Sequence, residues 1–583
     1  MTYVIDQKNC TGCHRCRVEC PADAIRFKNS KYWINPEKCT DCGHCVEVCH
    51  NECISNPDRP EPAPRLHKRI HKKCDVVVIG GGAAGLSAAA RAATLGAKVI
   101  VLEKGHEVGG SAWYAHMFRS HYSQWHRAAG VKDTRDKVYE QFMRKTKGQV
   151  DGKLFRRILD ANVDMIDWLI SEHNLGKDYV LGKGPFGALG LVSTYVEEYN
   201  AKRIDTSIGP GSNGWWFCLK LLGILKASGC EVLYKTAGSE LILDNNGKIT
   251  GVLAKDPGGE VEIACKACIV TAGAFTRNKK IMDKMQPLFY DDAGKEPVHI
   301  FTCSRSTGDG ITMGEKIGAD IDYTNRRVNL FGPMRHPYPC VSLAISRGGV
   351  IVNSVGELYK NSFGFSEISS LVFQPGRYCW TIVDDAMAED TIKSAMANKE
   401  KDVVNIDLNK QFVKWREILA EEEECGSVVS ANTLEKLGEK LGFDPQKFAA
   451  LIREQNEKPM EVPVMSPVGE ADDEDSMFSG MPPMPAPKKI KKPPFYALRL
   501  KLFHENSIGG MKTNENTNVL KNGKSIPGLY AAGDNIRGIM LPGDIGVQYI
   551  EGIISALTFA FNSGYISGVE AVRYLKGASQ DKV

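Results

Sequence analysis

Two groups of cysteines near the start of the chain have the spacing of metal-cluster ligands. Both read C-x-x-C-x-x-C-x-x-x-C, and their members are Cys10, Cys13, Cys16 and Cys20, then Cys39, Cys42, Cys45 and Cys49. Such turns direct three thiolates at one [4Fe–4S] cluster, and the fourth cysteine reaches the neighbouring cluster. Zinc sites normally use two C-x-x-C pairs and do not need a duplicated run of four. The spacing predicts one cluster on Cys10, Cys13, Cys16 and Cys49, and a second on Cys39, Cys42, Cys45 and Cys20.

This segment resembles the bacterial two-cluster ferredoxins along its whole length. Pro21 follows Cys20 as in those proteins, whereas His50 follows Cys49, so a proline is lost but no ligand. Cys53 is better explained as a buried spare thiol than as a ligand. We expect residues 1–56 to form a ferredoxin domain. Residues 57–73 are Pro-rich and then basic, and we expect a linker or a strap over the next domain.

The stretch Asp75 to Glu103 has the features of a dinucleotide-binding unit. Gly80, Gly82 and Gly85 lie at G-x-G-x-x-G spacing between a β-branched run, 76–79, and an Ala-rich segment. We expect strand, turn, helix and second strand, with the glycines allowing a tight turn, close approach to a pyrophosphate and close helix packing. Glu103 ends the second strand, where a carboxylate accepts hydrogen bonds from ribose hydroxyls.

Further motifs resemble the fumarate reductase and succinate dehydrogenase flavoprotein family, which binds FAD. They are Gly109-Gly110-Ser111, CIVTAGAF at 268–275, TGDGITMGEKIGA at 307–319 and IPGLYAAGD at 526–534. The resemblance covers roughly 74–583. It implies an α/β fold: a Rossmann-type FAD-binding domain in two parts, 74–325 and 504–583, with an inserted α+β capping domain at 326–503. Within that insertion, NTLEKLGEK at 432–440 predicts a capped helix.

The resemblance also implies which residues contact FAD. They are Gly80, Gly82, Ala84, Gly85, Glu103, Lys104, Gly110, Ser111, Ala237, Ala272, Gly273, Asp309, Gly533 and Asp534. In succinate dehydrogenase a histidine shortly after the second-strand acid tethers the flavin covalently, and Ser111 takes that place here. A hydroxyl there favours non-covalent FAD. The aromatic residues nearby, Trp113 among them, either line the substrate pocket or belong to the core.

The chain departs from the family where fumarate reductases hold their dicarboxylate. No arginine occurs between Gly348 and Gly376, or between Gly538 and Val572, where the family has its proton-donor and clamp arginines. Since an unpaired buried carboxylate is costly, fumarate or succinate is improbable as substrate. The candidates left for proton donation or carbonyl polarisation are His336 and His504 first, then Tyr359 and Tyr549.

These observations favour an enzyme that reduces an activated C=C bond, an enone or enoate, with electrons passed from the clusters to FAD. Two alternatives stay open: a sulfur enzyme that resembles adenylylsulfate reductase, or an electron-transfer subunit of a larger complex. The expected partners are a small-molecule substrate and a protein electron donor, such as a ferredoxin, a flavodoxin or an NADH-linked dehydrogenase. Both a homo-oligomer and a hetero-complex are compatible with the sequence.

Composition limits the remaining function classes. The 583 residues suggest two to four domains, and a net charge of +4 without a long basic run argues against nucleic acid as a partner. We see no signal peptide and no apolar run long enough to span a membrane. Because the cysteines are grouped at ligand spacing or scattered singly, we expect a reducing cytoplasm.

Overall fold

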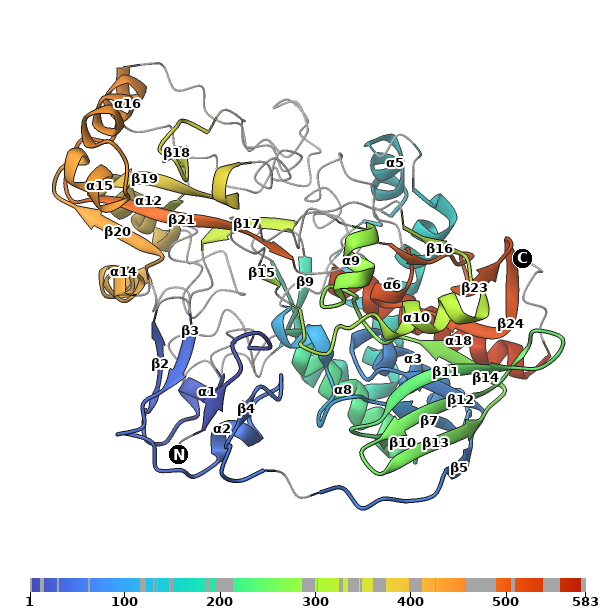
Figure 1. Cartoon of the computed structure of the whole chain (residues 1–583). Coiled ribbons are helices and arrows are strands. Elements are labelled where there is room, and N and C mark those ends of the chain that lie inside the picture. Colours follow the sequence, from blue (N-terminus) through green and yellow to red (C-terminus); the bar gives the residue numbers. More distant parts are fainter. Residues whose placement is uncertain are drawn as a thin grey trace.

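The computed structural model places the elements of three units. It describes residues 3–10, 15–28, 31–60, 63–115, 122–128, 130, 132–133, 135–145, 148, 150–177, 179–183, 189–193, 213–285, 299–300, 302–323, 329–333, 345–346, 349–359, 374–397, 412–424, 426–457, 489–504, 509–537 and 556–577. In Figure 1 the cysteine-rich unit lies at the lower left, the capping unit above it, and the flavin-type unit to the right. No helix among the described residues has the length and apolar character needed to cross a bilayer.

The cysteine-rich unit is built from two short antiparallel pairs and two single-turn helices. Its elements are β1 (Val4–Ile5), α1 (Arg15–Val18), β2 (Ile25–Lys28), β3 (Lys31–Ile34), α2 (His44–Glu47) and β4 (Ile54–Ser55). Strand β1 pairs with β4, and β2 pairs with β3. A small apolar core, including Ile5, Ile25 and Tyr32, packs among the cysteine side chains. With so little apolar core, a unit of this size depends on its clusters for stability.

The central sheet of the flavin-type unit has the order β10-β7-β6-β14-β24-β23. Its strands are β6 (Val76–Ile79), β7 (Val99–Leu102), β10 (Glu231–Leu233), β14 (Ala267–Val270), β23 (Asn518–Lys521) and β24 (Lys524–Ala531). The first five in space run parallel, and β23 is antiparallel to β24. All residues of β6, β7 and β14 are buried, as their continuous apolar runs require in a sheet covered on both faces.

Two helices cover this sheet in close contact with each other. They are α3 (Ala83–Thr94) and α18 (Ala556–Leu575). A Cβ atom on Gly564 would lie 2.1 Å from the carbonyl oxygen of Ala84, and one on Gly568 would lie 2.4 Å from that of Ala88. The backbones therefore touch, and only glycine fits at these two positions. Two further helices, α6 (Gly152–His173) and α8 (Asn213–Ala227), pack against α18 and α3.

The segment that joins the first two units follows the surface of the second. Strand β5 (Ile70–Lys73) pairs in parallel with β13 (Gly259–Ala264), as the last strand of a sheet with β11 (Ala237–Leu243) and β12 (Ile249–Asp256). His67 binds Asp256 at 2.8 Å, and Arg69 pairs with Glu260 at 2.6 Å. Figure 1 shows this segment running along the bottom of the molecule to the far edge of that sheet.

The capping unit is a mixed sheet with helices. Its longest strand, β21 (Phe495–His504), pairs with β15 (His299–Ile300), β17 (Asn329–Pro333), β19 (Tyr378–Asp384) and β20 (Val428–Ala431), and β18 (Val350–Asn353) pairs with β19. The helices are α12 (Asp385–Ala397), α14 (Trp415–Glu424), α15 (Leu434–Lys440) and α16 (Pro445–Glu457). Thr433 caps α15 by accepting a hydrogen bond from the amide of Lys436 at 3.1 Å, which confirms the capped helix.

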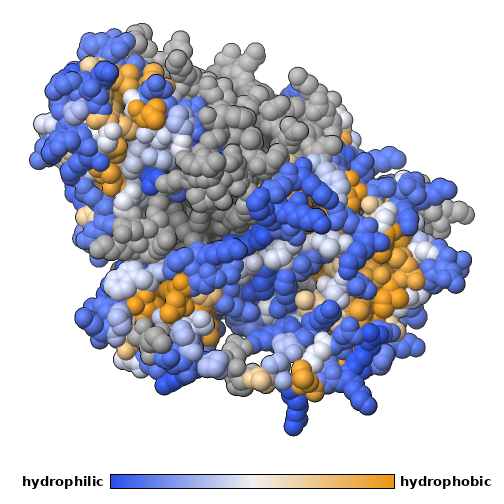
Figure 2. Space-filling model, viewed as in Figure 1, coloured by the Kyte–Doolittle hydropathy of each residue, from blue (hydrophilic) through white to orange (hydrophobic). Residues whose placement is uncertain are grey.

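The three units meet along their inner sides. An ion pair of 3.9 Å between Arg17 and Glu421 links α1 to α14, and further contacts described below join the cysteine-rich unit to the flavin-type unit. The face drawn in Figure 2 is mainly hydrophilic, with apolar residues in separate groups on each unit. The fold class is the mixed α/β arrangement that the motifs predict.

Candidate active site and electron-transfer interface

The glycine turn after β6 has the geometry that a dinucleotide requires. Gly80 has φ of 109°, and a Cβ atom there would lie 2.3 Å from the carbonyl oxygen of Thr271. A Cβ atom on Gly85 would lie 1.8 Å from the carbonyl oxygen of Gly80. Neither position accepts another residue, so the turn brings the first residues of α3 up to the end of the sheet. The cap residue of this helix, Gly82, makes no side-chain cap bond, which leaves amide donors for a phosphate.

Glu103 is held at the end of β7 by backbone donors. Its Oε2 accepts a hydrogen bond from the Gly81 amide at 2.9 Å, and its Oε1 accepts one from Gly105 at 2.7 Å. The side chain is 6% exposed. Each carboxylate oxygen retains acceptor capacity, so Glu103 suits the role at the ribose hydroxyls.

The second glycine pair lies beside the turn. Gly82 and Gly109 form a parallel bridge, and the Gly109 amide donates to the Gly81 carbonyl at 2.8 Å. A Cβ atom on Gly82 would meet its first neighbour only at 3.9 Å, and one on Gly110 only at 3.6 Å. There is therefore free space beside the Cα atoms of Gly82 and Gly110, whereas Gly80 and Gly85 have none. Such space is expected where backbone faces a flat ligand.

Asn535, which was not predicted from the sequence, ties the two returning segments of the site together. Its side-chain Oδ1 accepts from the Ala272 amide at 2.8 Å, and its amide group donates to the Gly273 carbonyl at 2.5 Å. Asn535 is 0% exposed and lies in the turn η8 (Gly533–Asn535). The only sequence signal was its place directly after Asp534.

Asp534 itself lies in the same turn. Burial raises the pKa of its carboxyl group to about 7. A desolvated carboxyl group without an opposite charge is expected where a ligand supplies the hydrogen bonds, so the position fits the predicted contact with the ribityl hydroxyls.

Two other residues predicted to contact FAD, Lys104 and Asp309, form an ion pair with each other. The Lys104 ammonium lies 3.0 Å from the Asp309 carboxylate and 2.7 Å from the Thr307 hydroxyl. Asp309 begins α10 (Asp309–Ile317). Ala237 begins β11 directly after Thr236, whose amide donates to the Glu103 carbonyl at 2.9 Å. Ser111 Oγ accepts from the Cys303 amide at 3.2 Å. Their contacts with FAD, and the non-covalent attachment, stay predictions.

Several thiols of the cysteine-rich unit lie near one another, and their assignment as ligands of two clusters stays a prediction. Burial, and then the nearby thiols of Cys39, Cys42 and Cys20, raise the pKa of Cys45 to about 12. The Cys49 sulfur lies 3.5 Å from that of Cys53, and Cys10 is another neighbour of Cys49. Cys13 lies outside the described residues. Among the residues the structure does describe, no three acidic, His or Cys side chains are already gathered as a metal site.

His50 is the centre of the contact between the two units. It is 0% exposed; its Nδ1 lies 2.8 Å from Glu107 Oε1, and its Nε2 lies 3.0 Å from the Gly110 carbonyl oxygen. Both partners are acceptors, so both ring nitrogens donate when both bonds form. The ring also packs on Trp113, at 4.7 Å between centroids, and Arg15 lies 4.5 Å from the same indole. Trp113 is thus part of this contact.

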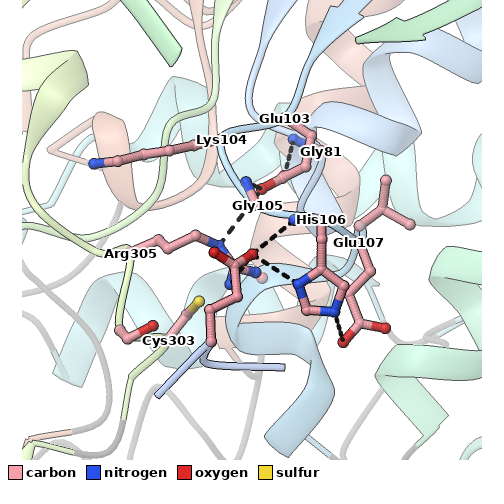
Figure 3. A network of polar contacts seen from close by, with 12 residues as sticks. Gly81, Glu103, Lys104, Gly105, His106, Glu107, Cys303 and Arg305 are labelled. Carbon is pink, nitrogen blue, oxygen red and sulfur yellow. Dashed lines mark hydrogen bonds and ion pairs between the residues drawn. The ribbon is translucent and has the colours of Figure 1, made fainter. Parts of the chain in front are cut away.

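Charged groups on both sides complete the interface. Arg305 donates to the His50 carbonyl and lies 3.6 Å from Glu103, while the His106 amide donates to Glu52 at 2.8 Å. Figure 3 shows Arg305, Glu103 and His106 gathered around the turn that follows β7. The interface residues come from four stretches of chain. Glu103, Gly110 and Trp113 were singled out from the sequence for other roles, and His50 was noted only as a missing proline.

Cys303 lies in this interface as well, 3.9 Å from His50 Nε2. Burial alone would raise the pKa of its thiol, but Arg305 and His50 outweigh burial and hold the pKa at about 7. For His50, burial opposes protonation, but the contacts with Cys303 and Glu107 raise the pKa of the imidazole. The pair therefore favours a thiolate beside an imidazolium.

Two of the four predicted catalytic residues, His504 and Tyr359, lie within the described residues. His336 and Tyr549 lie outside the described residues. His504 is the last residue of β21, and its Cα is paired with that of Ile300. Tyr359 is 8% exposed and packs with Phe275, Ile311 and other apolar residues between the capping and flavin-type units. A catalytic role for any of the four stays a prediction.

Comparison with known proteins decides the family. Residues 75–543 match the model of an FAD binding domain family, and residues 2–50 match a 4Fe-4S dicluster domain. The chain belongs to this FAD-binding family. It is an FAD-dependent oxidoreductase with iron–sulfur clusters, of the fumarate reductase type.

Several relatives are similar over most of the chain. A vinyl phenol reductase of Lactiplantibacillus plantarum is 26% identical over 86% of this chain and 97% of its own length. An NADH:fumarate oxidoreductase of Klebsiella pneumoniae is 25% identical over 84% of this chain, which spans only 47% of that longer relative. Among solved structures, the open form of a flavocytochrome c3 fumarate reductase superposes with a TM-score of 0.61 at 20% identity, covering 86% of this chain and 79% of that one.

Proposed function

We propose that this oxidoreductase reduces a C=C bond conjugated with a carbonyl group or an aromatic ring, using electrons that pass from two [4Fe–4S] clusters to FAD. The contact between His50 and Gly110 supports it most directly, because it joins the cysteine-rich unit to one of the glycines predicted to contact the flavin. Clusters supply single electrons, and a flavin collects two and delivers them as hydride. The chain's own part is to fix the two cofactor sites relative to each other and to position the substrate.

The substrate class follows from charge. Relatives include reductases of fumarate and of vinyl phenol, so the family alone does not choose between charged and uncharged substrates. The two arginine-free stretches, 348–376 and 538–572, favour a substrate without two carboxylates, because each buried carboxylate needs a charged or bidentate donor. We therefore place an enone, an enoate or a vinyl-aromatic compound ahead of a small dicarboxylate.

His336 and His504 are the proposed acid groups, with Tyr359 and Tyr549 as second choices. One group would donate a hydrogen bond to the carbonyl oxygen where negative charge develops, and another would protonate the carbon next to it. Asparagine in place of either histidine removes the proton but keeps a hydrogen-bonding side chain. His336→Asn or His504→Asn should lower kcat by roughly 100-fold or more while FAD reduction keeps its rate. A variant that retains its kcat excludes that histidine.

The electron donor is proposed to be a reduced carrier protein of the cytoplasm, a ferredoxin, a flavodoxin or an NADH-linked dehydrogenase. Its electrons would reach the flavin only through the clusters. Thiolate ligands and clusters of this kind persist in reducing compartments, which supports the location.

An anaerobic substrate panel tests the proposal. Reduced methyl viologen would be supplied with an enone, an enoate, a vinyl phenol and fumarate, and dye oxidation followed. We expect dye oxidation with at least one of the first three and a kcat/KM at least about tenfold lower with fumarate, the loss of a charged hydrogen-bonded contact. Turnover confined to fumarate would overturn the substrate class. Failure of every acceptor with fully loaded enzyme would overturn the reaction.

A further inference from the structure

The described residues give several contacts between the cysteine-rich unit and the flavin-type unit. They involve residues that flank the ligands of one predicted cluster. Arg15 lies between Cys13 and Cys16, and His50, Asn51 and Glu52 follow Cys49. Arg15 is 3.4 Å from Glu107, and the Ser304 amide donates to Asn51 Oδ1 at 3.1 Å. The backbone carbonyl of Lys8, two residues before Cys10, accepts from Arg277 at 2.9 Å.

The other predicted cluster has a different environment. Pro21, which follows Cys20 as His50 follows Cys49, is exposed, and so is the ligand Cys42. Glu37 and Lys38, just before Cys39, are exposed too. The two predicted cluster sites therefore have different surroundings: residues that flank the first contact the flavin-type unit, whereas the second includes Cys42, the one described ligand that is exposed.

We propose that the cluster on Cys10, Cys13, Cys16 and Cys49 is the one that passes electrons to FAD, and that His50 is the positioning residue that sets this transfer. The inference rests on the proposed electron relay and adds its order. The cluster on Cys39, Cys42, Cys45 and Cys20 accepts electrons from the donor protein first. Each transfer moves one electron, oxidises the reduced cluster from 1+ to 2+, and makes or breaks no bond in the protein.

His50 connects the predicted cluster to the flavin-type unit through few bonds. One peptide bond joins His50 to the ligand Cys49, and one hydrogen bond of 3.0 Å joins its Nε2 to the Gly110 carbonyl. Gly110 is beside the glycine bridge that faces the flavin site. Electron tunnelling falls exponentially with distance, so a side chain that holds this separation controls the rate without itself changing charge. Trp113 and Glu107 fix the imidazole from two further sides.

The duplicated motif supplies the test variant. His50→Pro places at position 50 the residue that the other half carries at position 21, so cluster assembly should persist while both ring hydrogen bonds are lost. His50→Gln retains a donor for the Gly110 carbonyl. His44→Gln is the matched control, since His44 is next to the ligand Cys45 but has a side chain that is 43% exposed and is paired with Glu47.

The measurements are iron, sulfide and FAD content, stopped-flow reduction of the flavin after the clusters, and amide hydrogen exchange of 109–114. With full cofactor content, His50→Pro should slow flavin reduction roughly tenfold or more and speed exchange in that segment. His50→Gln should recover most of the rate, and His44→Gln should leave both readouts unchanged. If His50→Pro loses iron, His50→Leu replaces it, because it removes the same bonds without changing the backbone.

Two outcomes would overturn the inference. One is a cluster-loaded His50→Pro or His50→Leu protein whose flavin is reduced at the wild-type rate with unchanged exchange. The other is a slowing by His44→Gln as large as that by the His50 variants. The proposed function fails by different results. The relay is wrong if wild-type clusters never reduce the flavin, and the substrate class is wrong if the wild-type enzyme turns over only fumarate in the acceptor panel.

Discussion

The two halves of the duplicated cysteine motif share a sequence pattern but not a role. Four residues after the last cysteine, each half has a small buried residue, Ala24 in one and Cys53 in the other. The amide of each donates to the sulfur of that last cysteine, at 3.3 Å and 3.4 Å. One residue after the last cysteine the halves differ: Pro21 is exposed, and His50 is buried against Gly110. The repeat keeps what a cluster needs, and the residue directly after its last cysteine marks which predicted cluster lies on the flavin side.

The largest expected effect comes from removing one ligand from each predicted cluster in turn. Cys16→Ser removes a ligand of the flavin-side cluster, and Cys42→Ser removes one from the exposed cluster. With a protein donor, both should lose at least about 100-fold in turnover, more than changes around a metal site usually cost. With reduced methyl viologen, a small diffusing donor, Cys42→Ser should keep more activity than Cys16→Ser. The reverse order would exchange the roles of the two clusters.

The next test separates cofactor retention from docking. Asp534 lies in the turn η8, and burial raises the pKa of its carboxyl group to about 7 from an ordinary 3.8. The folded chain then keeps a proton that the unfolded chain has lost, so the free energy of unfolding falls as pH rises from about 4 to 7, by up to about 1.4 kcal/mol per pH unit.

Asp534→Asn should remove this slope in urea unfolding of FAD-free protein, and it should weaken FAD binding by roughly 10-fold, the loss of one charge-assisted hydrogen bond. Cluster content should not change. The His50 variants should show the opposite pattern, with FAD retained and electron transfer slowed. If Asp534→Asn leaves the pH slope intact, the raised pKa is wrong.

A smaller effect tests the partner of His50. Glu107 Oε1 contacts His50 at 2.8 Å and Arg15 at 3.4 Å. Glu107→Gln leaves a buried imidazole and a guanidinium without their carboxylate, which should lower the free energy of unfolding by about 1–3 kcal/mol. Chemical denaturation of cluster-loaded protein measures it. Glu47→Gln, which pairs with His44 and has a side chain 79% exposed, is the control and should change little.

The parts that the sequence predicted are those whose determinants are local. The strand, turn and helix from Asp75 to Glu103 follow from contiguous residues, and Thr433 signals the start of α15 three residues before its bond partner. The continuous apolar runs of β6 and β7, and the contact between Gly85 and the Gly80 carbonyl, involve residues close in sequence, so the pattern alone carries them. The assignment of the cysteines to two clusters also depends only on local spacing, and it stays a prediction.

The interface could not be predicted because its partners are distant in sequence. His50 meets Gly110, 60 positions away, and Cys303, 253 positions away. The loss of a proline at position 50 was visible, but its meaning depends on which face of the ferredoxin unit meets the flavin site. Asn535 likewise bonds to Ala272, 263 positions earlier. Residues of this kind are recognised only when the fold brings their partners together.

The smallest expected effect concerns Cys53, the position where the two halves should be equivalent. Its amide bond to Cys49 is a backbone contact that alanine keeps, and Ala24 shows that alanine fits the matching site. Cys53→Ala should therefore cost no more than about 1 kcal/mol and leave iron and sulfide content unchanged. Because its sulfur lies 3.5 Å from that of Cys49, a loss of cluster content would show instead that this thiol takes part in binding iron. The flavin-side cluster would then differ from the exposed cluster in its ligands as well as in the residue that docks it.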